Sequence, residues 1–154
     1  MVGRVLVAGS INMDIVARAP RFPRIGETVA GFDLHFFPGG KGANQAVAAA
    51  KSGASTELIG KIGQDAFGRD LKAFLAKQGV GLARVMEITE AQTGTAIITV
   101  SDAHNTIVVV AGANGLVGPS DMDAVNIEPG DVLVSQFEIP VETIKDFFSR
   151  VFGS

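Results

Sequence analysis

The sequence contains no cysteine, no tryptophan and no tyrosine, and only two histidines. Without thiols the chain forms no disulfide, no thiolate metal site and no cysteine nucleophile. We expect His35 and His104 to be surface residues, because no second metal-binding side chain stands beside either. No apolar run is long enough to span a bilayer, and the N-terminus lacks the pattern of a secretory signal. These absences predict a cytoplasmic protein with no membrane partner.

Basic character is also scarce. The 13 lysines and arginines are outnumbered by 16 acidic residues, the net charge is −3, and no basic run occurs. We therefore expect no nucleic-acid partner. In contrast, 47% of the residues are hydrophobic and 19% are charged, which is typical of a folded core. A length of 154 residues suits one domain.

Apolar strand-like segments alternate with helical segments along most of the chain. Strands are predicted at residues 5–8, 56–59 and 131–135, and helices at about 41–51, 65–79 and 141–152. Such alternation favours an α/β fold with a parallel sheet covered by helices. Two further segments do not fit it: residues 26–37 read as one or two strands, and residues 95–111 read as a hairpin. We interpret these two as a small β structure beside the main sheet.

A glycine-rich bend precedes the first predicted helix. Gly39, Gly40 and Gly42 allow a tight turn and a close approach of the backbone to a ligand. Lys41 and Asn44 add polar groups that suit a ligand rich in hydroxyls or oxyanions. The spacing is not that of a phosphate-binding P-loop, and the dinucleotide glycine fingerprint is missing after the first strand. A simple turn that leads into a closely packed helix explains the glycines, but it does not explain the presence of Lys41 and Asn44.

Polar side chains also follow two of the predicted core strands. Asn12 and Asp14 come after the first strand, and Glu138 follows the third. Because the carboxyl ends of parallel strands form one rim of the sheet, these residues are candidates for a shared pocket. Simpler roles are a turn cap for Asp14, a solvated surface position for Lys41 and Glu138, and a helix cap for Asn44.

These motifs together resemble the ribokinase-like family of carbohydrate kinases. The matching segments occur in the family's order and spacing and cover nearly the whole chain: residues 9–14, 23–28, 38–46, 60–65 and 111–114. The resemblance implies a ribokinase-like parallel sheet with a β lid, formed by segments at about 15–38 and 95–111. It implies that the sugar hydroxyls are bound by six residues, namely Asn12, Asp14, Gly40, Lys41, Asn44 and Glu138.

The resemblance further implies transfer of the ATP γ-phosphate to the primary hydroxyl of ribose or a related furanose, with ATP and Mg²⁺ as cofactors. The family's second motif, Asp-Thr-x-Gly-Ala-Gly-Asp, supplies the catalytic base and does not occur in this sequence. We therefore expect residues 1–154 to be the N-terminal part of one kinase domain, without the nucleotide-binding half and inactive alone. The alternative is a non-catalytic sugar-binding or self-associating fragment. A parallel sheet with an open edge also predicts a homo-oligomer, through the lid strands or that edge.

Overall fold

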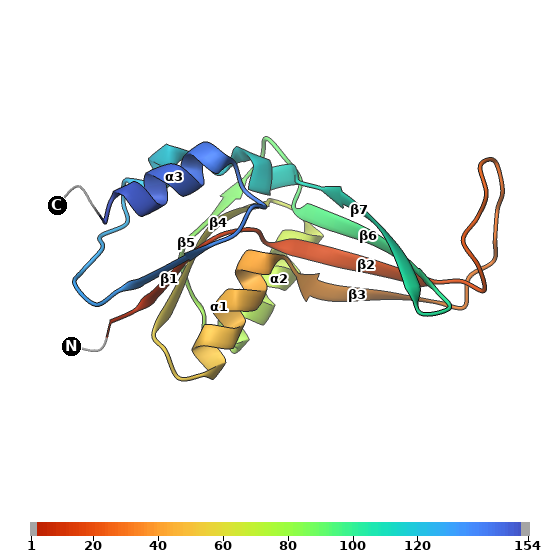
Figure 1. The fold of residues 1–154 in the computed structure, drawn as a ribbon, viewed down its shortest axis with the longest axis horizontal. Helices are drawn as coiled ribbons and strands as arrows, with labels where there is room; N and C mark the ends of the chain where they lie inside the picture. The colour runs from red at the N-terminus through yellow and green to blue at the C-terminus, as the bar shows by residue number, and fades with distance from the viewer. Residues whose placement is uncertain (1–2, 152–154) are drawn as a thin grey trace.

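The computed structural model describes residues 3–151. Its main sheet has four parallel strands in the order β5-β4-β1-β8. Helices α1 and α2 cover one face of this sheet and α3 covers the other, which confirms the predicted α/β architecture (Figure 1). The strands are β1 (Val5–Ala8), β4 (Thr56–Gly63), β5 (Gly81–Ile88) and β8 (Val132–Ser135), and the helices are α1 (Lys41–Lys51), α2 (Ala66–Lys77) and α3 (Val141–Ser149).

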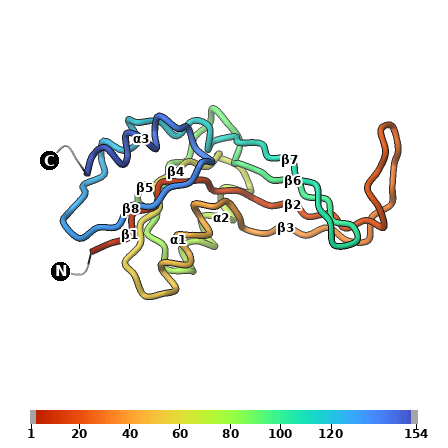
Figure 2. The backbone as a smooth tube through the Cα atoms, in the orientation of Figure 1, coloured from red at the N-terminus to blue at the C-terminus, as the bar shows by residue number. Residues whose placement is uncertain are grey.

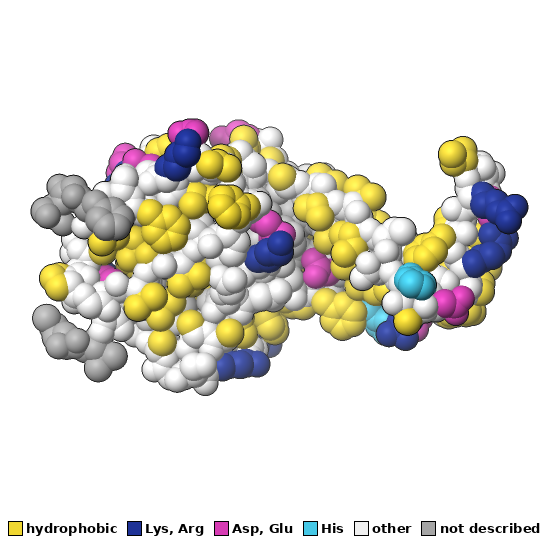
Figure 3. All heavy atoms as spheres, viewed as in Figure 1, with side chains coloured by type: hydrophobic (Ala, Val, Ile, Leu, Met, Phe, Trp, Pro, Cys, Tyr) yellow, Lys and Arg dark blue, Asp and Glu magenta, His cyan; other side chains and the backbone are white. Residues whose placement is uncertain are grey.

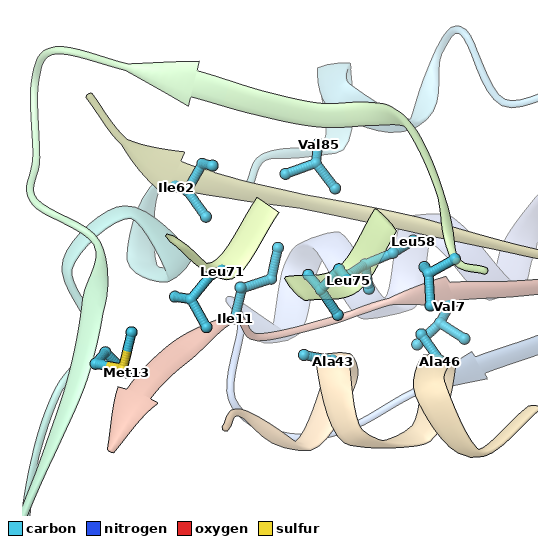
Figure 4. Close-up of a cluster of buried hydrophobic side chains, with 11 residues drawn as sticks. Val7, Ile11, Met13, Ala43, Ala46, Leu58, Ile62, Leu71, Leu75 and Val85 are labelled. Atoms are coloured by element: carbon cyan, nitrogen blue, oxygen red, sulfur yellow. The ribbon is translucent and has the colours of Figure 1, made fainter. Parts of the chain in front are cut away.

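Successive residues of β1 point to opposite faces of the main sheet and contribute to two core clusters, one on each face. Val7 packs toward α1 and α2, whereas Leu6 and Ala8 pack toward α3, and all three are fully buried. Figure 4 shows the first of these clusters, in which side chains from the strands meet Ala43 and Ala46 of α1. A strand buried on both faces reads as a continuous apolar run, which is why this strand was recognisable from the sequence.

Helix α1 lies unusually close to the main sheet at its first turn. A Cβ atom on Gly42 would stand 2.5 Å from the carbonyl carbon of Gly9 and 2.6 Å from the amide nitrogen of Ser10. Only a glycine permits this approach. The contact places the start of α1 directly against the segment that follows β1, where the candidate polar residues lie.

A second sheet extends away from this body as a long ribbon (Figures 1 and 2). Its strand order is β3-β2-β6-β7, with β2 and β6 parallel and the two outer pairs antiparallel. Many of its apolar side chains are exposed, and Figure 3 shows hydrophobic surface along it. The strands are β2 (Asn12–Arg18), β3 (Asp33–Gly39), β6 (Gly94–Ser101) and β7 (His104–Val110).

Three details differ from the sequence prediction. Strand β5 was missed, because its apolar residues neither alternate strictly nor form a continuous run. Residues 26–32 form no strand; β3 begins at Asp33 and ends at Gly39, the first glycine of the bend. Helix α3 ends at Ser149, and residue 152, the last of the predicted helix 141–152, lies outside the described residues. Among the described helices, none has the length and apolar character required to cross a membrane.

Candidate sugar-binding site

All six residues singled out from the sequence line one pocket of about 340 Å³. The pocket lies where the carboxyl ends of β1 and β8 meet the start of α1 and the second sheet. Its apolar lining comes from β6 and β7, on the same face of the second sheet as Asp14. The polar residues are Asn12, Asp14, Gly40, Lys41, Asn44 and Glu138, and the apolar ones are Ala96, Ile98, Ile107 and Val109.

The glycine bend shapes the floor of this pocket. Gly40 has φ +89° and ψ 132°, a conformation that side-chain-bearing residues avoid. A Cβ at this position would lie 2.7 Å from the carbonyl oxygen of Ser10 and 2.8 Å from the amide nitrogen of Asn12. The bend is therefore pressed against the backbone that joins β1 to β2. The N-cap residue Gly40 has no side chain, and the first N–H groups of α1 are bonded by other segments: that of Lys41 to Glu138, that of Gly42 to the Ser10 hydroxyl, and that of Ala43 to the Ser10 carbonyl oxygen.

Asp14 lies on β2, on the same face of the second sheet as Ala96 and Ile98, by strand register. Its neighbour in space is Gly39, where a Cβ would come within 2.6 Å of the Asp14 carboxylate oxygens. The pKa of Asp14 is raised, first by burial and second by the nearby charge of Glu138. A partly desolvated carboxylate of this kind gains from ligand groups that donate hydrogen bonds.

Glu138 is held in place by the elements around it. Its Oε2 atom accepts hydrogen bonds from the Ser10 hydroxyl at 2.6 Å and from the backbone N–H of Lys41 at 3.2 Å. The Lys41 ammonium lies 3.6 Å from Oε1. The side chain is 25% exposed. The interpretation of Glu138 as a solvated surface residue is therefore wrong, because it bridges β8, α1 and the β1–β2 connection.

Lys41 and Asn44 present exposed polar groups on the first turn of α1. The Lys41 side chain is 68% exposed, so its contact with Glu138 is a surface ion pair worth little by itself. Asn44 is exposed, and it makes no capping hydrogen bond to the start of α1.

Sequence reasoning missed two buried polar residues behind the pocket. Ser10 contacts Glu138 as described, and Asn114 donates a hydrogen bond from Nδ2 to the Asn12 Oδ1 atom at 2.7 Å. Both are about 1% exposed. Each lies within one of the motifs described above, at residues 9–14 and 111–114, for which the sequence predicts no role at that position. The signal available was the presence of a hydrogen-bonding side chain in an otherwise apolar segment.

A second, more apolar pocket of about 520 Å³ adjoins the first and shares Asn12, Val109 and Glu138 with it. Phe137 lines it and is 86% exposed. Across residues 3–151, no group of three or more histidine or acidic side chains is placed to hold a metal ion.

Comparison with known proteins shows the family to which this chain belongs. The model of the pfkB family of carbohydrate kinases matches residues 2–146. The chain belongs to this family. It is 41% identical over 144 residues to ribokinase of Bacillus subtilis, which covers 92% of this chain and 49% of the relative. It is 38% identical over 138 residues to ribokinase of Mus musculus, covering 88% of this chain and 43% of that protein.

Solved structures of this family superpose well on the chain. Ribokinase from Thermotoga maritima matches 96% of the chain with a TM-score of 0.88 and 34% identity. Ribokinase of Arabidopsis thaliana, solved with ribose and ATP, matches 96% with a TM-score of 0.80 and 31% identity. The match covers 49% and 50% of those chains, respectively. The chain thus spans about half the length of the ribokinases it matches and has the N-terminal half of their fold.

Proposed function

We propose that this chain forms the sugar-binding half of a ribokinase-type kinase and that its pocket binds ribose or a related furanose. The carrying observation is that six polar residues from separate segments of the chain line one small pocket. A volume of about 340 Å³ lies at the lower end of the range for small-molecule sites. The ribose-bound Arabidopsis ribokinase among the structural relatives supports the choice of sugar.

The polar and the apolar residues of the pocket suit the two kinds of surface on a sugar ring. The carboxylates of Asp14 and Glu138 accept hydrogen bonds from hydroxyl groups, and Lys41 and Asn44 donate them. The apolar wall of β6 and β7 packs against the C–H groups of the ring. In this arrangement the second sheet acts as the lid over the sugar. Hydroxyl groups of the bound sugar also donate hydrogen bonds to Asp14, which partly compensates for the desolvation of this carboxylate.

In the complete fold, the proposed activity is transfer of the ATP γ-phosphate to the primary hydroxyl of the bound sugar. Phosphoryl transfer requires a residue that positions or deprotonates the attacking hydroxyl and groups that hold the phosphates and Mg²⁺. The described residues offer no metal-binding cluster, so they do not fit Mg²⁺, and no ATP-binding motif is present. Residues 1–154 therefore contribute sugar binding and orientation, and we expect no turnover from them alone.

Titration calorimetry tests the sugar site. Ribose should give a saturable heat with the wild-type chain and none with Asp14→Asn, which removes the pocket carboxylate. Asp33→Asn is the matched control, because Asp33 lies on the neighbouring strand β3 but outside the pocket. A wild-type chain without measurable heat, or equal loss in both variants, would overturn the assignment of the pocket.

A coupled assay with Mg-ATP and ribose tests the second part of the proposal. We expect no ribose-dependent formation of ADP by the isolated 154 residues. Clear sugar-dependent turnover would show that these residues carry a complete catalytic apparatus, and it would refute the half-site proposal while leaving the sugar assignment intact.

A further inference from the structure

The side-chain amide of Asn114, behind the pocket, is held by hydrogen bonds on both of its ends. It belongs to the 3-10 helix at Gly112–Leu116 and is 1% exposed. Its Oδ1 atom accepts a hydrogen bond from the backbone N–H of Ile11 at 2.9 Å, and its Nδ2 atom donates to the carbonyl oxygen of Ile11 at 3.2 Å. A backbone N–H only donates and a carbonyl oxygen only accepts. The Asn114 amide therefore has a single orientation compatible with both bonds.

That orientation fixes the next amide in the chain of hydrogen bonds. The Asn114 Nδ2 group also donates to Asn12 Oδ1 at 2.7 Å, so the carbonyl of Asn12 faces inward. If Asn12 were turned over, two NH₂ groups would face each other without an acceptor. Among the described residues, the one buried side-chain polar atom without a partner is the Oε1 atom of Gln136. The Asn12 NH₂ group is therefore not fully buried, and it faces the two adjoining cavities that Asn12 lines.

Gly94 provides independent evidence that this pair of amides is built into the fold. Gly94 lies directly beside Asn12 in the register of β2 and β6. A Cβ at Gly94 would stand 2.1 Å from Asn114 Nδ2 and 2.3 Å from Asn12 Oδ1. Any larger residue would occupy the space of the hydrogen bond itself. The glycine thus leaves room for the Asn114–Asn12 bond on the pocket side of the second sheet.

We infer that Asn114 is a positioning residue, which sets the amide of Asn12 so that the pocket receives N–H donors beside the acceptor-only carboxylate of Asp14. A hydroxyl group complements this pair, because it accepts from Asn12 and donates to Asp14. A ligand carboxylate would be repelled by Asp14, and a ligand ammonium would find no acceptor on Asn12. The consequence for sugar recognition rests on the proposed function, whereas the orientation of the amides does not.

Side-chain amide exchange, measured by NMR on the ligand-free chain, tests the orientation. In the wild type, the Asn114 amide protons should exchange at least about tenfold more slowly than those of Asn12, because they are buried and take part in hydrogen bonds. Asn114→Asp places an oxygen against Asn12, so Asn12 should turn its NH₂ inward and its amide protons should exchange more slowly than in the wild type. A purely structural role for Asn114 would only accelerate that exchange. Equal exchange rates in the wild type, or faster Asn12 exchange in the variant, would overturn the inference.

Gly94→Ala is a second variant, in case Asn114→Asp does not fold. It should accelerate exchange of the Asn114 amide and weaken ribose binding at least about tenfold, which corresponds to the loss of one charged or well-placed hydrogen bond. Gly115→Ala is the matched control, since a Cβ there meets only the Ala111 side chain at an ordinary 3.6 Å. Unchanged Asn114 exchange in Gly94→Ala would contradict the inference. If the wild type binds no ribose, the proposed function fails, but the exchange rates still decide the orientation.

Discussion

Replacing Gly40 with alanine should damage both the fold and the pocket, and Gly53→Ala provides a matched control. Both glycines have nearly the same φ, +89° and +90°. A Cβ on Gly53 would meet nothing within 4 Å, whereas a Cβ on Gly40 would meet the backbone of Ser10 and Asn12 at 2.7–2.8 Å. The difference between the two variants therefore isolates the close contact beneath the pocket from the cost of positive φ.

We expect Gly53→Ala to lower the free energy of unfolding by about 1 kcal/mol, the typical cost of a positive φ on a residue with a Cβ. Gly40→Ala should cost about 3 kcal/mol, because the contact with Ser10 and Asn12 must open in addition to the cost of the positive φ. Urea denaturation measures both values, and calorimetry with ribose measures binding. Only Gly40→Ala should lose ribose affinity. Equal destabilisation, or wild-type affinity in Gly40→Ala, would show that the bend does not shape a sugar site.

Three further predictions concern charge and assembly. Asp14→Asn should raise the melting temperature while abolishing ribose binding, because it removes a partly buried charge. In the wild type, the affinity for ribose should fall at mildly acidic pH, because the raised pKa of Asp14 lets this carboxylate take up a proton at a higher pH than an ordinary aspartate does. The pKa of Asp131 is lowered to about 2, mainly by the hydrogen bond from Arg4, so the ionised Asp131 stabilises the fold above pH ~4 and this contribution is lost as the pH falls through about 2. Asp131→Asn should remove this acid dependence. It should lower the free energy of unfolding, measured by urea denaturation, by at most about 2 kcal/mol, since solvent reaches Arg4. Light scattering should detect a dimer or larger oligomer, weakened by Val108→Glu if the second sheet mediates it, and a monomeric wild type at working concentration would argue against assembly.

Much of the core was predictable because its signals are local. The buried strand β1 reads as a continuous apolar run, and α1 matches the predicted range of residues 41–51. Strand β5 was missed because its outward residues interrupt the apolar pattern. Its identity depends on pairing with β4, a long-range contact that no local pattern encodes.

The candidate site likewise has residues that local patterns predict and contacts that they do not. Residues beside glycines or at the ends of predicted strands could be nominated from the sequence, and the structure brings them to one pocket. Ser10 and Asn114 act through contacts with residues more than 100 positions away in the chain, so their partners became visible only in three dimensions. Residue type alone identified the groups that face the pocket, but not the groups that hold them.

A crystal structure of the chain with ribose would test the central claim most directly. We predict that the sugar ring lies between Gly40 and the apolar wall of β6 and β7, with its hydroxyls on Asp14 and Asn12. Density for ribose at another site, or an empty pocket at a saturating concentration of the sugar, would contradict the account.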